Sequence, residues 1–334
     1  MNKSENKIYY LYIAFSFIFI AVTTNYLSLY DIIFVANQTD SLSYTAIAKN
    51  APLLSGENFF ILNNKETLIQ QHVAQRFVIP YIIGSIAHFL NVDFFLIFKL
   101  FTLIFIFFYI FLINILIKKL NFKLKVSILF FSILFLNPYV IRYHIFQPIQ
   151  AHDMLFFCFG LLFSLTMISK KYFSNLLISI IAIYLRQTSI ALLIGSSIFL
   201  LINKKIKLFL LLFLLSSLSL FLTIKTGQLI TSDTFPINLA YGIIYYDFNQ
   251  FEKLLKFLLL GIMPFAPLFV ILFGKINKNI KISSAFILLF VCLMMIGQPI
   301  LGGPDGSVNN VGRIANLCFP ILTCFCFYVW NFEK

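Results

Sequence analysis

The sequence predicts an all-helical integral membrane protein, a polytopic bundle of about ten transmembrane helices of which two are short. Three observations support this prediction. Of the 334 residues, 60% are hydrophobic, and the mean hydropathy is +0.94. Apolar runs of about 18 residues recur along the chain, which is the length that crosses a bilayer. Only 11% of the residues are charged. Inside lipid, such runs must be helical because every backbone N–H and C=O needs an internal partner.

The first apolar run covers residues 9–27. It is too long for a signal peptide and no small-residue cleavage site follows it, so we expect a retained helix. Later runs are separated by short lysine clusters that begin at Lys118, Lys170, Lys204 and Lys275. Lysines between spans mark cytoplasmic turns, so the net charge of +13 reflects topology and not nucleic-acid binding. Rich Ile, Phe, Asn and Lys usage indicates a bacterial protein, so we expect the inner membrane as its location. Lys3 and Lys7 place the N-terminus in the cytoplasm, and the lysine clusters between spans place the C-terminus there as well.

Every lysine cluster must lie on the cytoplasmic side, and this requirement sets the expected spans within one transmembrane domain, residues 1–334. After the first helix these are 94–117, 126–141, 153–169, 206–224, 254–274, 282–300 and 314–330. The loops expected on the extracytoplasmic side are 30–93, 138–153, 225–253 and 301–313.

Two segments do not fit a simple crossing. Residues 76–91 are short and contain Pro80, Gly84 and His88, so we expect an interfacial helix within the first external loop. Residues 172–203 have a cytoplasmic lysine cluster at each end, but as helix they rise only about 48 Å, against about 60 Å for two crossings. We therefore expect a short hairpin whose apex lies below the outer surface, with an aqueous cavity that reaches Arg186, because an arginine at that depth needs protein or water around it.

The chain has 21 lysines but only four arginines, and all four fall on the predicted outer side: Arg76, Arg142, Arg186 and Arg313. A guanidinium group binds phosphate or carboxylate with two parallel hydrogen bonds and keeps its charge. This pattern favours an anionic ligand, such as a phosphate, at the outer face. The structural alternative is that each arginine pairs with a local acid or a helix C-terminus.

Acids on the same side complete the pattern. Asp40 follows the first helix, Glu66 lies in the first external loop, and Asp153 stands where a helix re-enters the membrane. An acid at a helix start also caps backbone N–H groups, and this alternative applies to Asp40 and Asp153.

Four stretches resemble the C-type (GT-C) fold of polyprenyl-phosphate-dependent glycosyltransferases, as a small bacterial member without a soluble periplasmic domain. They are residues 40–48, 75–80, 142–153 and 185–189. The resemblance implies that Asp40 is a catalytic base or a metal-site acid, with Asp153 as a second catalytic acid. It also implies that Asp153 and Glu66 could join Asp40 at a divalent metal, the one cofactor it leaves open.

The resemblance further implies a lipid-linked sugar donor and a glycan or lipid-linked acceptor. Arg186 would hold the donor phosphate, with Arg313, Arg142 and Arg76 as further phosphate ligands. The residues expected at the acceptor or sugar are Tyr44, His152, Gln150 and Tyr245. The structural alternatives are that the tyrosines form an interfacial aromatic belt and that His152 makes a plain polar contact.

Three other functions fit a polytopic protein with arginines on its outer side. One is an enzyme similar to O-antigen polymerases, although the loop at 225–253 has no arginine and the longest external loop comes first. Another is a transporter or flippase for a lipid-linked anionic solute, for which the hairpin at 172–203 is the one broken element. The third is a non-catalytic scaffold. All four functions place the chain in a lipid bilayer, with no nucleic-acid partner.

Overall fold

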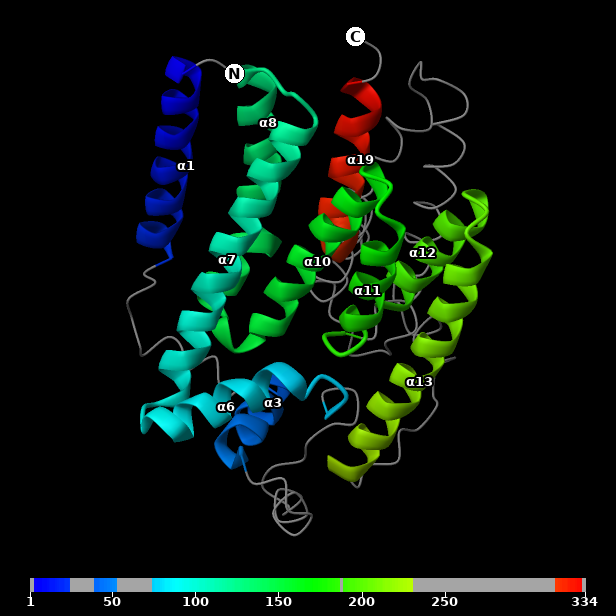
Figure 1. Cartoon of the computed structure of the whole chain (residues 1–334). Coiled ribbons are helices and arrows are strands. Elements are labelled where there is room, and N and C mark those ends of the chain that lie inside the picture. Colours follow the sequence, from blue (N-terminus) through cyan, green and yellow to red (C-terminus); the bar gives the residue numbers. More distant parts are fainter. Residues whose placement is uncertain (1–2, 25–38, 53–73, 187–188, 231–315, 332–334) are drawn as a thin grey trace, which may run out of the picture.

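The computed structural model describes residues 3–24, 39–52, 74–186, 189–230 and 316–331, in which every regular element is a helix (Figure 1). Four helical stretches are long and apolar enough to cross a membrane, or five if one bent pair forms a single span. Within the described residues, the prediction of a helical protein with helices that can span a membrane is thus confirmed. The expected spans at 254–274 and 282–300 lie outside the described residues.

Helix α10 (Ala151–Ile168) is the central helix of the described bundle. In its candidate span 72% of the apolar window is buried, against 17% in α1 (Lys3–Thr23) and in α13 (Ile206–Ile230). It packs against α7 (Phe94–Lys119) and α19 (Phe319–Asn331). Side chains on α10 are therefore held by protein on several sides, whereas α1 and α13 expose wide apolar faces.

The span expected at 126–141 is broken. Helix α8 (Leu124–Phe135) ends before Asn137, and the chain continues as the π-helical turn η1 (Pro138–Arg142) and the short helix α9 (Tyr143–Phe146). The two parts are bent by 43°. Pro138 has no N–H to continue the helix, and the Asn137 side chain accepts a hydrogen bond from the Tyr139 N–H at 3.0 Å. The break turns the chain toward the start of α10.

Helices α3 (Thr39–Asn50) and α6 (Val78–Leu90) form a layer across the end of the bundle opposite to the chain termini (Figure 1). They cross at Gly84, where an added Cβ would overlap the backbone carbonyl of Ala48. A small residue there lets the two backbones approach closely. Helix α6 ends at Asn91, which adopts the left-handed conformation (φ 52°), and Asp93 then caps α7 by accepting from the Phe95 N–H at 2.9 Å.

The hairpin consists of α11 (Tyr172–Ala182) and α12 (Ile190–Ile202). As helices they rise about 16 and 20 Å, less than the roughly 30 Å of a bilayer core. A buried polar network ties them together and to α10. Asn175 donates to Thr166 Oγ1 at 3.0 Å and accepts from Ser196 Oγ at 2.6 Å, and Ser196 Oγ lies 2.5 Å from Ser179 Oγ. The network fixes the depth of the hairpin apex.

Three lysine-rich turns lie at the end of the bundle that carries the chain termini (Figure 1). They join α7 to α8, α10 to α11, and α12 to α13, and their lysines fall within 118–125, 170–171 and 204–207. The opposite end holds α3, α6 and the start of α10. The two ends therefore differ in charge among the described residues, as the spacing of the clusters predicts.

Candidate functional site

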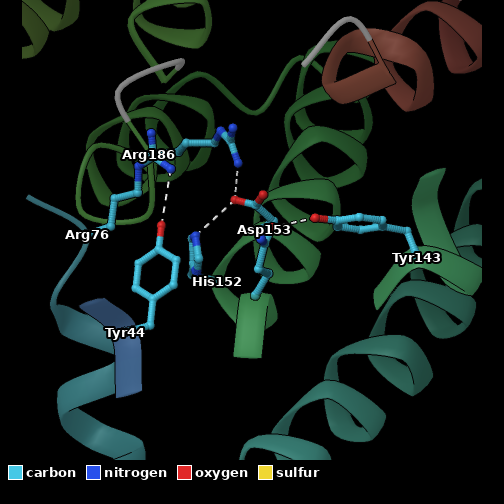
Figure 2. A network of polar contacts seen from close by, with 7 residues as sticks. Tyr44, Arg76, Tyr143, His152, Asp153 and Arg186 are labelled. Atoms are coloured by element: carbon cyan, nitrogen blue, oxygen red, sulfur yellow. Dashed lines mark hydrogen bonds and ion pairs between the residues drawn. The ribbon is translucent and has the colours of Figure 1, made fainter. Parts of the chain in front are cut away.

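The candidate site is built around the start of α10. A 3-10 turn, η2 (Pro148–Gln150), leads into the helix and places Asp153 in its first turn. The N-cap position is Gln150, which makes no side-chain cap. The Asp153 carboxylate instead forms an ion pair with the Arg186 guanidinium at the hairpin apex (Figure 2). The structure thus supplies a partner for Asp153 other than the helix N-terminus.

This ion pair is closed off from solvent. Asp153 is 1% exposed and Arg186 is 2% exposed. We expected an aqueous cavity to reach Arg186, and that expectation is wrong, because protein surrounds the side chain. Two charges buried at this depth cost several kcal/mol each to desolvate, and only close pairing and further polar contacts offset that cost. Ionisable groups retained inside a membrane domain mark functional positions more often than structural ones.

Three more side chains extend the pair into a cluster (Figure 2). His152 Nε2 lies 3.1 Å from Asp153 Oδ1, and the His152 ring packs on the ring of Tyr44 with centroids 4.4 Å apart. The Tyr44 hydroxyl accepts a hydrogen bond from Arg76 Nη1 at 3.2 Å. We call these five residues the buried cluster: the buried Tyr44, His152, Asp153 and Arg186, and the half-buried Arg76. The cluster joins three parts of the fold: the layer of α3 and α6, the central helix α10, and the apex of the hairpin between α11 and α12.

Gln150 belongs to a neighbouring set of contacts. It is 4% exposed, and its Oε1 accepts a hydrogen bond from the Tyr143 hydroxyl at 3.0 Å. On the other flank, Thr102 Oγ1 of α7 donates to the Pro148 carbonyl at 3.0 Å. These bonds hold η2 between α9 and α7, so the start of α10 is fixed from both sides.

Lys99 is a candidate that the sequence analysis missed. It lies in α7 at 8% exposure, one helical turn before Thr102, which bonds to η2. Residues three apart on a helix share a face, so Lys99 lies on the side of α7 that faces the site. A single lysine inside an otherwise uncharged apolar run is the signal that could have identified it.

The other predicted site residues are not brought into the cluster by the described part of the chain. Arg142 is exposed at the end of η1. Asp40 lies one helical turn before Tyr44 in α3, and its side chain falls outside the described residues. Arg313, Glu66 and Tyr245 lie outside them altogether.

Of the three metal ligands proposed from the sequence, only Asp153 has a side chain within the described residues. Its carboxylate is engaged by Arg186 and His152. Within the described ranges, no three His, Cys, Asp or Glu side chains gather as metal ligands. Two arginines from different segments contact this cluster, Arg186 through the Asp153 carboxylate and Arg76 through the Tyr44 hydroxyl.

Comparison with models of protein families, with curated proteins and with solved structures finds no match.

Proposed function

We propose that this protein is a membrane glycosyltransferase that transfers a sugar from a polyprenyl-phosphate donor to a glycan or lipid-linked acceptor. The observation that carries the proposal is the buried cluster, in which Arg186 and Arg76 approach a carboxylate and an imidazole. The cluster lies at the end of the bundle away from the lysine-rich turns (Figure 1). Lysine-rich turns face the cytoplasm, so the proposed active side is the extracytoplasmic face of a bacterial inner membrane.

The ligand chemistry follows from the arginines. A phosphate diester at headgroup depth needs cationic donors, and guanidinium groups supply them in a fixed planar geometry. Asp153 orients Arg186 before the donor binds, which lowers the cost of ordering a long side chain. The polyprenyl chain of the donor remains in the bilayer beside the bundle. Arg313 and Arg142 are the further phosphate ligands that the resemblance to GT-C enzymes supplies.

The proposed step is a substitution at the anomeric carbon of the sugar. An acceptor hydroxyl oxygen bonds to that carbon as the bond from the carbon to the phosphate oxygen breaks. The electron pair leaves with polyprenyl phosphate, and the hydroxyl proton passes to a base, for which Asp40 is the candidate. Arg186 and Arg76 stabilise the charge that develops on the phosphate.

The number of helices and the likeness to the GT-C fold belong to the same proposal. A GT-C-like bundle of about ten helices requires spans within 231–315 in addition to the described ones. The layer of α3 and α6 corresponds to the interfacial helices of the first external loop.

The proposal is tested with the full-length protein in proteoliposomes that contain a polyprenyl-phosphate sugar and a hydroxyl acceptor. We expect release of polyprenyl phosphate together with a covalently glycosylated acceptor. The Arg186→Lys and Asp40→Asn variants should lose most of this activity, whereas Lys119→Arg, at an exposed lysine near the opposite end of the bundle, should retain it. Unchanged turnover in both of the first two variants would remove the proposed roles of Arg186 and Asp40.

The second candidate is a transporter or flippase of a lipid-linked anionic solute. The burial of His152, Asp153 and Arg186 favours transport, because buried ionisable groups within membrane domains line substrate and ion pathways. The same proteoliposomes separate the two functions. Movement of an intact sugar lipid across the bilayer, with no glycosylated acceptor, would replace the transferase with a transporter.

A further inference from the structure

A cavity lies at the opposite end of the bundle from the buried cluster. It has a volume of about 330 Å³ and lies between the first turns of α1 and the last turns of α7. Its lining residues are Asn6, Tyr9, Tyr10, Asn114, Ile117, Lys118, Asn121 and Phe122. The cavity is half open, at the level of the turn that joins α7 to α8.

The polar part of this lining consists mainly of hydrogen-bond donors. The Tyr9 hydroxyl donates to Asn114 Oδ1 at 2.8 Å, which fixes the Asn114 amide with its NH₂ group available as a donor. Asn6 and Asn121 supply two more amides, and Lys118 supplies an ammonium group. None of the lining residues is acidic. Such a set matches a phosphate, which offers only acceptor oxygens and negative charge.

The surroundings of the cavity indicate a lipid. On α7, Phe107 is 56% exposed and Phe111 is 57% exposed, and both belong to the candidate span. Phe111 precedes Asn114 by three residues and Lys118 by seven, so the ring lies on the face of α7 that leads to the cavity. An acyl chain can lie along this face while its phosphate enters the cavity. The neighbouring turn carries Lys119 and Lys123, both exposed, which attract an anionic leaflet surface.

We propose that this cavity binds the phosphate of an anionic phospholipid headgroup in the leaflet at the lysine-rich end of the bundle. Lys118 and the amides of Asn6, Asn114 and Asn121 contact the phosphate, and Ile117 and Phe122 form the apolar floor beneath it. The site is separate from the buried cluster, so a failure of the glycosyltransferase proposal leaves it intact.

The test is lipid binding to the full-length protein in detergent, measured by native mass spectrometry. Phosphatidylglycerol is compared with phosphatidylcholine, and inorganic phosphate is added as competitor. We expect preferential retention of phosphatidylglycerol. Lys118→Gln should weaken it about tenfold, because it removes a charged donor that contacts the phosphate directly. Asn121→Gly should also weaken it, because it removes one amide while glycine accepts the left-handed backbone (φ 53°) at this position.

The matched control is Lys119→Gln, because Lys119 is the next residue of α7 but does not line the cavity. We expect lipid retention in this variant to stay near that of the unmodified protein. Equal weakening by Lys118→Gln and Lys119→Gln would show diffuse charge attraction and overturn the site. Equal retention of the two lipids, or displacement by millimolar inorganic phosphate, would overturn its assignment to an anionic lipid.

Discussion

The ring of Tyr44 packs on the ring of His152, with centroids 4.4 Å apart and planes at 51°. Tyr44 belongs to the surface layer, and His152 belongs to the first turn of the central helix. Figure 2 shows Tyr44 of α3 beside His152, which in turn contacts Asp153 of the ion pair with Arg186. Any movement of α3 away from the bundle would therefore expose the buried cluster.

Tyr44 offers the most direct test of this contact. Tyr44→Phe keeps the ring on His152 but removes the hydroxyl that accepts from Arg76. The lost bond is worth about 1 kcal/mol, so transfer activity should fall about fivefold with little change in the melting temperature. Tyr81→Phe is the matched control, because its hydroxyl bonds to the Pro52 carbonyl in the same layer. Similar loss in both variants would show that the layer, and not the Arg76 contact, is responsible.

The ion pair of Asp153 and Arg186 predicts strong non-additivity. Asp153→Asn or Arg186→Gln alone leaves one buried charge without its partner, which costs about 3–5 kcal/mol. The double variant removes both charges, so its melting temperature should lie above that of either single variant. Thermal unfolding in one detergent measures all four proteins. Simple addition of the two losses would show that the pair does not stabilise the bundle.

Gly84 should be intolerant of even one methyl group. Gly84→Ala would drive Cβ into the Ala48 backbone carbonyl and force α3 away from α6. We expect loss of activity and easier proteolysis of α3. Gly160→Ala is the matched control, because its Cβ would meet the Ile321 side chain at 3.3 Å, which can adjust. Equal effects of the two substitutions would contradict the close crossing of α3 and α6.

Asn175 should hold the hairpin at its depth. Asn175→Leu removes the bonds to Thr166 and Ser196, two buried hydrogen bonds worth about 1 kcal/mol each. The melting temperature should fall by several degrees. Ser197→Ala, on the same helix as Ser196, removes only a bond within the helix to Leu193 and should be nearly neutral. A neutral Asn175→Leu would show that apolar packing alone sets the hairpin.

Sequence reasoning predicted the helical class and several elements from length and charge alone. The apolar run at 94–117 appears as α7, and the run at 153–169 appears as α10. The short hairpin followed from counting: 32 residues between lysine clusters cannot cross the membrane twice, and the structure places α11 and α12 there. These predictions depend only on the typical thickness of a bilayer core and on the rise per residue of a helix.

The partners within the site could not be predicted in the same way. Asp153 and Arg186 were singled out separately, and no spacing rule reveals that a helix start and a hairpin apex meet. The break at Asn137 and Pro138 was missed because the apolar pattern continues through it, although the proline was a visible signal. Lys99 was overlooked because lysines elsewhere in the chain mark topology.

The short hairpin also has a mechanical consequence. Where α11 and α12 stop, the bundle is thinner than the lipid around it, and a hydrophobic mismatch of this kind is relieved by thinning the bilayer or by covering the gap with protein. The layer of α3 and α6 lies across this same end of the molecule (Figure 1). Either response brings polar surroundings closer to the hairpin apex than to the middle of the longer helices.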